Sequence, residues 1–446
     1  MLNNYIINKY KYLSNEDCNP LSLILCVSGG IDSMVMLDIF KNMRHDFKIN
    51  ILVSHINYQV HDLSNKSEEF VKKYCLNHDI NFRSNRVKIN NRSNFEAKAR
   101  RIRYEIFNEI LVESNFNYIC TAHHLDDQIE TLYMKYKQNA PITSFRGILE
   151  IDKKKWRPLL GLKKTDIKIY AKKSKLKWIE DSTNLNTNYL RNNFRHNEVP
   201  KLKKENPRLI KNIFKKKKHA NNLFKKANFL KKTFINEGKI KKNKNFKYYE
   251  ILKLDFIKLE LNIKKIIIQS FLNDFDLNLQ SMTELHWKTF WQFLNNDNIG
   301  KEFLLYSRIK FLISNNKYIL YDPKSLKIQK YELIDGLKWY NSEFNFIDKN
   351  KYLKDIENTF ILSKSDYKNK IYVRNWKHGD KIKNKENKPH TKISRLFSNK
   401  KFSKLDKALH PILVDENDNP ILVPNLRHNN CNNRFRENIV VKWQQN

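Results

Sequence analysis

Two kinds of segment alternate over the first 140 residues of the chain. Short apolar runs predict buried strands, at 21–27, 51–57 and 118–122, and a weaker alternation covers 81–89. Apolar positions at helical spacing predict helices between them, at 34–40, 68–78, 95–112 and 125–137. Strands that alternate with helices predict an α/β domain whose parallel sheet is covered on both faces. In such sheets, ligands bind beyond the carboxyl ends of the strands.

The pattern changes after residue 200. Apolar residues at helical spacing, with Lys between them, predict a long basic amphipathic helix within 201–250, and helix-like periodicity continues over 251–294. Strand-like runs follow between 302 and 322, and short strands and turns fill the last hundred residues. The sequence therefore predicts an α/β domain, a mainly helical basic domain and a small α+β domain, at 1–215, 216–340 and 341–446.

Composition adds a strong positive charge to this picture. The formal net charge is +38, from 85 Lys and Arg residues against 47 Asp and Glu residues. Eighteen of the 50 residues at 201–250 are basic and three are acidic. A field of this strength attracts polyanions, and nucleic acid is the first candidate partner. A coding bias is the alternative source, because the chain is rich in Lys, Asn and Ile and contains 8 Gly.

The cysteines and the terminus exclude several classes of protein. The five cysteines are scattered and form no CxxC pair, so neither a disulfide scaffold nor a zinc site is expected. The N-terminus lacks a signal-peptide pattern, and no apolar stretch of 18 residues occurs. We therefore expect a cytoplasmic protein without membrane association.

The strongest chemical signal is the SGGIDS loop that follows the first apolar run. Two glycines allow a tight turn and let backbone amides approach phosphate oxygens, and the N-terminus of the next helix favours an anion. The loop lacks the Lys of the Walker pattern, so γ-phosphate transfer is not indicated. Phosphates would repel Asp32 unless a cation lay between them, which indicates Mg²⁺. The pattern predicts a phosphate-binding loop formed by Ser28, Gly29, Gly30, Ile31, Asp32 and Ser33.

A second polar cluster, TAHHLDDQIET at 121–131, follows the third apolar run. Helical spacing allows Glu130 to share a face with Asp126 or with Asp127. Carboxylates in a first helical turn also occur simply because they stabilise the helix. We predict that Asp127 completes the Mg²⁺ site and that His123 contacts phosphates or stabilises a leaving group. Zinc is not expected, because the cluster is rich in carboxylates and contains no Cys.

A third segment, NFEAKARRIRY at 94–104, carries closely spaced arginines. Arg100 and Arg103 lie about one helical turn apart near the expected start of a helix. Guanidinium groups in this arrangement suit the charge that develops on an α-phosphate. A solvated basic helix face is the alternative for this segment taken alone.

These three segments and His55-Ile56-Asn57 resemble the N-type ATP pyrophosphatase superfamily, also called PP-loop proteins, and more narrowly the tRNA(Ile)-lysidine synthetase family. The SGGxDS pattern marks only the superfamily, whereas TAHHxDDQxET and EAxARxxRY are specific to the family. The resemblance is dense over roughly 21–200 and moderate over roughly 370–425. Further matching segments are Arg157–Leu160, Glu180–Asn184, Tyr189–His196 and, more weakly, Val373–Ile382.

The resemblance implies a Rossmann-like PP-loop ATPase domain and a ligase that forms a carbon–nitrogen bond. ATP would adenylate the C2 oxygen of the wobble cytidine in the CAU anticodon of tRNA(Ile) and release pyrophosphate. Free L-lysine would then displace AMP and form lysidine. The implied cofactors are ATP and Mg²⁺, and tRNA(Ile) and L-lysine are the implied partners.

The resemblance also implies roles for individual residues. The loop Ser28–Ser33 and His55 would bind the nucleotide, and Asp32 and Asp127 would hold the metal. The catalytic residues would be Asp32, Arg103, His123 and Asp127. Among the substrate-binding residues, Glu130 or Asp126 would hold the lysine, Arg191 and Arg195 would contact tRNA phosphates, and Arg100 would bind charge near the α-phosphate.

The chain departs from the family pattern at a few positions. Tyr58 stands where a second His is common, Asn425 replaces an expected Gly, and the usual Arg is missing from Asp406–Ala408. The first departure would alter an adenosine contact. The others fall in the C-terminal domain, away from the catalytic loops.

Two other function classes stay open at this point. One is another enzyme of the superfamily, such as a tRNA thiolase or an amide-forming ligase, although thiolation normally needs cysteines at a spacing that this chain lacks. The other is a non-catalytic basic RNA-binding protein, which leaves the loop and the paired histidines without a purpose. The sequence does not predict an oligomeric state.

Overall fold

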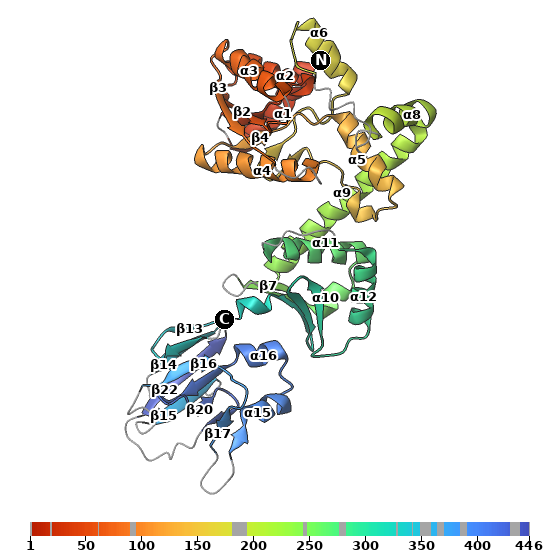
Figure 1. Ribbon diagram of the computed structural model, residues 1–446. Helices are drawn as coiled ribbons and strands as arrows, with labels where there is room; N and C mark the ends of the chain where they lie inside the picture. The colour runs from red at the N-terminus through yellow and green to blue at the C-terminus, as the bar shows by residue number, and fades with distance from the viewer. Residues whose placement is uncertain are drawn as a thin grey trace. The chain divides into compact units, whose positions relative to one another are not determined.

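The computed structural model describes most of the chain in two compact units, Met1–Leu223 and Phe224–Asn446 (Figure 1). The described residues are 2–17, 20–60, 62–89, 95–180, 194–243, 248–275, 282–326, 329–340, 342–347, 358–363, 370–383, 390–428 and 438–445. Among these residues, no helix combines the length and the apolar character that crossing a membrane requires.

A six-stranded sheet forms the centre of the N-terminal unit, with the order β3-β2-β1-β4-β6-β5. Its strands are β1 (Ser22–Cys26), β2 (Asn50–Asn57), β3 (Asn81–Arg86), β4 (Tyr118–Cys120), β5 (Ile151–Asp152) and β6 (Lys155–Trp156). All neighbouring strands are parallel except β5 and β6. The Rossmann-like parallel sheet predicted from the apolar runs is therefore confirmed.

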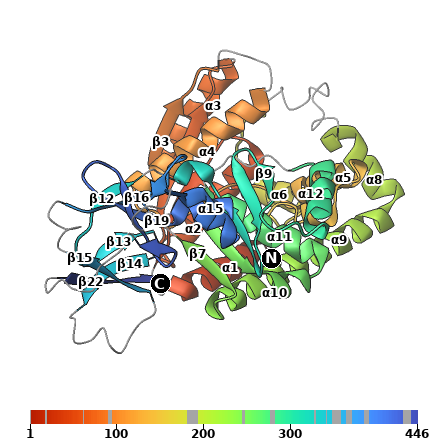
Figure 2. The same ribbon diagram turned by 90° about the horizontal axis from the view of Figure 1, so that it is seen from below.

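Helices cover both faces of this sheet, because alternate residues of the buried strands point to opposite sides. Leu23 and Leu25 of β1 belong to a core formed with α1, α2, α3 and α6, whereas Ile24 belongs to a second core under α4. Figures 1 and 2 show β3 at the outer edge of the sheet beside α3. The helices are α1 (Leu2–Asp17), α2 (Ile31–Met43), α3 (Asp62–Leu76), α4 (Phe95–Glu113), α5 (Leu125–Lys137) and α6 (Lys164–Lys173).

The order of the strands fixes the place of the candidate site. The chain runs outward from β1 through β2 to β3, and then returns to place β4 on the other side of β1. At such a reversal the loops beyond the two central strands separate and leave room for a ligand. The SGGIDS loop follows β1 and the paired histidines follow β4, so both motifs lie at this edge of the sheet.

The basic segment after residue 200 begins as predicted, with helices. A π-helical turn η3 (Phe194–Glu198) leads into α8 (Val199–Glu205) and the 30-residue α9 (Pro207–Asn236). The long basic helix predicted within 201–250 is α9, whereas the strands β7 (Ile240–Asn243) and β8 (Tyr248–Leu252) that follow it were not predicted. Gly238, whose φ is +71°, turns the chain out of the helix, since this backbone conformation suits glycine.

The C-terminal unit contains helices packed on an antiparallel sheet and further sheets beyond it. The first sheet has the order β7-β8-β11-β10-β9, with β9 (Glu302–Tyr306), β10 (Ile309–Ile313) and β11 (Lys317–Tyr321) at the predicted strand-like runs. Aromatic contacts such as Phe290 with Phe311 pack its helices against it. These helices are α10 (Lys253–Ile257), α11 (Leu261–Leu272) and α12 (Glu284–Asn295).

Two more antiparallel sheets, with the orders β12-β16-β19-β20-β21 and β13-β14-β22-β15, form the last part of the chain. Their strands are β12 (Lys330–Glu332), β13 (Leu337–Trp339), β14 (Ser342–Ile347), β15 (Thr359–Ser363), β16 (Tyr372–Asn375), β19 (Pro411–Val414), β20 (Pro420–Val423), β21 (Arg427–His428) and β22 (Asn438–Gln445). A small hairpin and two short helices complete the part: β17 (Lys381–Ile382), β18 (Thr391–Lys392), α15 (Ile393–Asn399) and α16 (Lys404–Leu409). Since β12 and β13 pair with later strands, this α+β part includes residues before 341.

Candidate active site

The SGGIDS loop is held in shape by its own serines. Gly29 has φ +88°, a backbone conformation that residues with a side chain rarely adopt. Gly30 is the residue immediately before α2, and its carbonyl accepts a 2.8 Å hydrogen bond from the Ser33 hydroxyl. The Ser28 amide donates to the same Ser33 oxygen at 3.2 Å. The loop is therefore preformed, with the N-terminus of α2 directed at the space where a phosphate would bind.

His55 fastens the end of β2 to the strand that carries the loop. The imidazole is buried, and its Nδ1 lies 2.8 Å from the Val27 carbonyl oxygen. Because only a protonated nitrogen can donate to that oxygen, Nδ1 carries the hydrogen. Burial lowers the pKa of His55, which favours the neutral ring. His55 thus supports the loop from the neighbouring strand.

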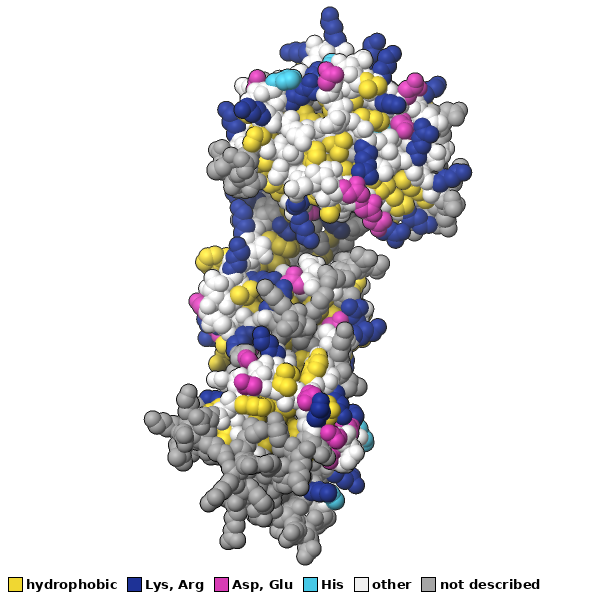
Figure 3. Space-filling model, turned by 90° about the vertical axis from the view of Figure 1, so that its left-hand side faces the viewer, with side chains coloured by type: hydrophobic (Ala, Val, Ile, Leu, Met, Phe, Trp, Pro, Cys, Tyr) yellow, Lys and Arg dark blue, Asp and Glu magenta, His cyan; other side chains and the backbone are white. Residues whose placement is uncertain are grey.

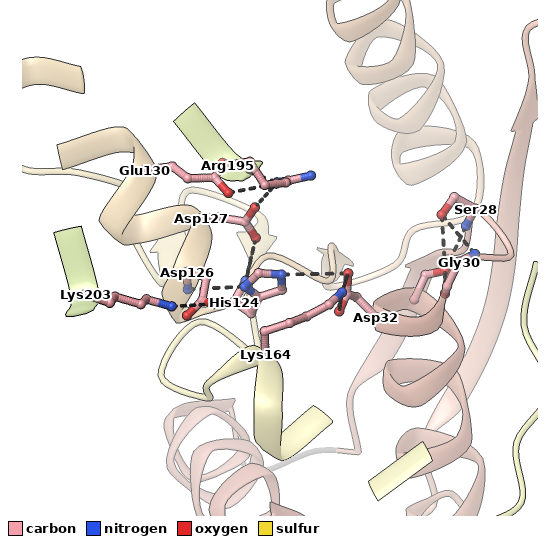
Figure 4. A network of polar contacts seen from close by, with 11 residues as sticks. Ser28, Gly30, Asp32, His124, Asp126, Asp127, Glu130, Lys164, Arg195 and Lys203 are labelled. Carbon is pink, nitrogen blue, oxygen red and sulfur yellow. Dashed lines mark hydrogen bonds and ion pairs between the residues drawn. The ribbon is translucent and has the colours of Figure 1, made fainter. Parts of the chain in front are cut away.

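Asp32, in the first turn of α2, is paired with a lysine that the sequence analysis did not single out. The Lys164 ammonium lies 2.5 Å from Oδ1 and 2.6 Å from Oδ2 of Asp32 (Figure 4). Lys164 is the first residue of α6, and each of the two side chains is 28% exposed. The carboxylate predicted to face phosphates therefore already holds a cation.

His124 lies between Asp32 and Asp127 (Figure 4). Its Nδ1 accepts a 3.2 Å hydrogen bond from the Asp126 amide, and its own amide donates to Asp127 Oδ2 at 2.9 Å. These two bonds cap the N-terminus of α5. Nε2, which carries the hydrogen of a neutral ring, lies 3.8 Å from Asp32 Oδ2. The predicted residue of the histidine pair, His123, instead places Nδ1 2.9 Å from the Thr121 hydroxyl.

Each of the three carboxylates of α5 is matched by a cation from a later segment. Arg195 donates from Nε to Glu130 and from Nη2 to Asp127, both at 2.7 Å. Lys203 of α8 lies 2.7 Å from Asp126. Burial acts to raise the pKa of Asp127, but His124 and Arg195 hold it below its usual value. Two cations thus pair with the three carboxylates of the cluster TAHHLDDQIET, which are not free.

Arg103 is held by the residue that departs from the family pattern. Its Nε donates to the Tyr58 hydroxyl at 2.8 Å, and its guanidinium lies 5.6 Å from the centre of the Tyr58 ring. The same hydroxyl donates to the Ala99 carbonyl oxygen at 3.2 Å, which ties the end of β2 to α4. Arg100 is exposed and lies over the Tyr104 ring, at 5.3 Å from its centre. Arg191 lies outside the described residues.

The donor set suits Mg²⁺ shared with a substrate. Mg²⁺ is usually held by one or two carboxylates together with phosphate oxygens and water. Asp32 and Asp127 supply two carboxylates on either side of one histidine ring. Within the described ranges, no group of three or more His, Cys, Asp or Glu side chains forms a complete metal cage. Asp32 and Asp127 are the two carboxylates that a metal arriving with a nucleotide would contact.

Four residues that lie in this arrangement were given no role by the sequence analysis. Lys164 and Lys203 are two of many lysines, and no spacing distinguishes them from the others. Lys164 does start the helix that follows the family segment Arg157–Leu160, which is the one signal that could have indicated it. His124 is adjacent to the predicted histidine, and Tyr58 was noted only as a departure.

Several known proteins resemble this chain, over its N-terminal part or over most of its length. Residues 2–202 match the model of the PP-loop domain. A tRNA(Ile)-lysidine synthase of Staphylococcus epidermidis is 26% identical over 432 residues, which cover 94% of this chain and 95% of that protein. The synthase of Petrotoga mobilis is 31% identical over 214 residues, 47% of this chain and 68% of that protein. That of Enterococcus faecalis is 32% identical over 197 residues, 43% of each chain. The chain belongs to the tRNA(Ile)-lysidine synthase family.

Proposed function

We propose that the N-terminal unit binds ATP at the SGGIDS loop and adenylates the wobble cytidine of tRNA(Ile), and that free L-lysine then displaces AMP. Membership of the family and the PP-loop domain make the chain an ATP-dependent ligase that forms lysidine in tRNA(Ile). The observation that carries the proposed mechanism is the meeting of the loop after β1 with the acidic start of α5, through Asp32 and His124. Because the substrate is a tRNA, we place the reaction in the cytoplasm.

The loop and the start of α2 would bind the pyrophosphate part of ATP. Their amides and the helix N-terminus favour a polyanion, and the serines already fix the turn. Asp32 and Asp127 would hold a Mg²⁺ ion, which would neutralise phosphate charge when bound. Arg103 and His123 would stabilise charge at the α-phosphate, and the Tyr58 hydroxyl would orient the guanidinium of Arg103.

The acidic start of α5 would receive the lysine substrate. Asp126 and Glu130 each already bind a cationic side chain at 2.7 Å, so their surroundings suit an ammonium group. For Arg195 we favour a role in holding Glu130 and Asp127, since its guanidinium makes both contacts. The lysine amine must be neutral when it attacks C2, and a neighbouring carboxylate can accept its proton.

Basic surface outside the site would hold the tRNA. Eighteen Lys and Arg residues lie between 201 and 250, and most of them are on α8 and α9. On the face drawn in Figure 3, Lys and Arg side chains are spread over the described surface, and acidic side chains, including one cluster in the upper part of the view, lie among them. Each contact with an RNA phosphate releases counterions, so we expect the affinity for tRNA to fall steeply as salt increases. Arg100 and Arg191 remain predicted contacts with charged substrate groups.

The test follows the fate of ATP. Incubation of the protein with α-labelled ATP and a tRNA(Ile) transcript should yield labelled AMP only when lysine is added, whereas the adenylated tRNA should accumulate without lysine. Asp32→Ala should abolish both products, and Lys168→Met, an exposed change on α6, should leave them intact. Formation of AMP that requires a sulfur donor instead of lysine would indicate a thiolase and refute the proposal.

A further inference from the structure

The Lys164–Asp32 ion pair is notable because Asp32 is one of the two carboxylates that we propose as metal ligands. Both oxygens of Asp32 lie within 2.6 Å of one ammonium nitrogen. The two residues are 132 positions apart in the sequence, and the packing of α6 places this ammonium beside the start of α2. A side-chain cation at the phosphate-binding loop is thus part of the folded unit.

The helix that carries Lys164 does not depend on this contact for its position. Ile167 and Ala171 of α6 are fully buried in the core that α6 shares with α1 and α2. The Tyr170 hydroxyl donates to buried Asp38 of α2 at 2.9 Å. Apolar burial and a buried hydrogen bond to a carboxylate hold helices together more strongly than a partly exposed ion pair does. The Lys164 ammonium can therefore leave Asp32 without a change in the position of α6.

A divalent ion and this ammonium compete for the same oxygens. A metal that binds Asp32 needs one of the lone pairs that now face Lys164, and the two positive charges repel each other at such short range. The ammonium is a mobile point charge on a flexible four-carbon stem, so it can move without moving α6. The nearest new partner would be the phosphate charge that enters the SGGIDS loop.

We propose that Lys164 is the counter-ion of Asp32 before nucleotide binds, that Mg²⁺ displaces it when nucleotide binds, and that its ammonium then pairs with the phosphates. Lys164 is thus a further residue of the catalytic site. The proposal rests on the proposed role of Asp32 as a metal ligand. It explains how a carboxylate on a phosphate-binding loop is kept neutralised in the absence of metal, and why metal and nucleotide would enter together.

Metal binding to the full-length protein without nucleotide tests the competition. Mn²⁺ is the probe, and free Mn²⁺ is measured by electron paramagnetic resonance. In Lys164→Met and Lys164→Gln, loss of the competing charge should tighten Mn²⁺ binding roughly five- to tenfold. Lys164→Arg and the control Lys168→Met should match the wild-type protein, and Asp32→Asn should remove the site in every background. Unchanged or weaker Mn²⁺ binding in both neutral variants would overturn the proposal, as would tight binding that survives Asp32→Asn.

Binding of inorganic pyrophosphate in the presence of saturating Mg²⁺, which keeps Lys164 displaced from Asp32, tests the second half. Calorimetry should show roughly fivefold weaker binding in Lys164→Met and Lys164→Gln, and full affinity in Lys164→Arg. Equal pyrophosphate affinity in all variants would overturn the proposal. Neither experiment measures lysidine, so the outcome is separate from the proposed function. The function can fail in the ATP and lysine assay while the competition at Asp32 stands, and the reverse also holds.

Discussion

Replacement of Arg195 by Met should destabilise the N-terminal unit by about 2–3 kcal/mol. Its guanidinium holds Glu130 and Asp127, which are 2% and 6% exposed. Breaking a buried ion pair from one side costs about 3–5 kcal/mol, because the remaining charge stays buried. The side chain of Arg195 is itself 36% exposed, so solvent screens part of its charge and the expected loss is lower.

The loss should also depend on pH in a defined direction. The pKa of Asp127 is held below its usual value in the folded protein, although burial opposes this shift. Stability from such a group is present above its unfolded pKa, about 3.9, and is lost as pH falls through the lower folded pKa. Without Arg195 the buried carboxylates gain protons at higher pH, because a neutral acid is easier to bury. The deficit of the variant should therefore shrink between about pH 7.5 and about pH 5.

Urea unfolding of the full-length protein measures the loss of stability and its pH dependence. The transition of the N-terminal unit is identified as the one that ATP shifts to higher urea concentration. Lys203→Met is the matched control. Lys203 also binds a carboxylate of α5 at 2.7 Å, but its side chain is 39% exposed and that of Asp126 is 22% exposed. This exposed pair should contribute at most about 1 kcal/mol. Equal losses of stability in the two variants, or a stability deficit of Arg195→Met that grows as pH falls, would contradict the conclusion that Arg195 stabilises the buried carboxylates of Asp127 and Glu130.

Three other perturbations test other parts of the account. Asp32→Ala should lower AMP formation by about 10²–10³-fold without unfolding the protein, and a folded variant with full activity would refute its catalytic role. Tyr58→Phe should lower the rate of single-turnover adenylation about tenfold, because the guanidinium of Arg103 loses its 2.8 Å hydrogen-bond partner. The affinity for ATP should change little, and a variant that loses only ATP affinity would refute the proposed role of Tyr58. A chain that ends at Leu326 should keep ATP binding but bind tRNA more weakly, with a shallower salt dependence in filter binding; an unchanged salt slope would exclude RNA contacts beyond that point.

The fold of the N-terminal unit was predictable because its signals are local. β1 is an apolar run that is followed by two glycines, and each element from β1 to α5 follows from its own periodicity. The first helix, α1, was not predicted. The strands β7 and β8 were missed for a physical reason. Helical spacing of apolar residues extends to the end of α9, and the turn at Gly238 is a single residue in a Lys-rich region. Pairing of β8 with β11, which fixes the strand, is a contact between distant segments.

The candidate site was predictable only to the level of motifs. The SGGIDS loop and the acidic start of α5 carry recognisable spacing, and the sheet order brings them together. Which histidine of the pair turns inward is set by the cap of α5, where His124 has an extended backbone and accepts the Asp126 amide. The partners Lys164 and Lys203 come from later helices, and only tertiary structure selects them from 85 basic residues.

The most direct test of the central claim is transfer of labelled L-lysine to tRNA. The purified protein, ATP and Mg²⁺ are incubated with a tRNA(Ile) transcript whose anticodon is CAU, and the modified nucleoside is identified by mass spectrometry after digestion. The account predicts lysidine at the wobble position, with none in a transcript that carries uridine there and none with the Asp32→Ala protein. Cleavage of ATP to AMP without any lysine in the tRNA would contradict it.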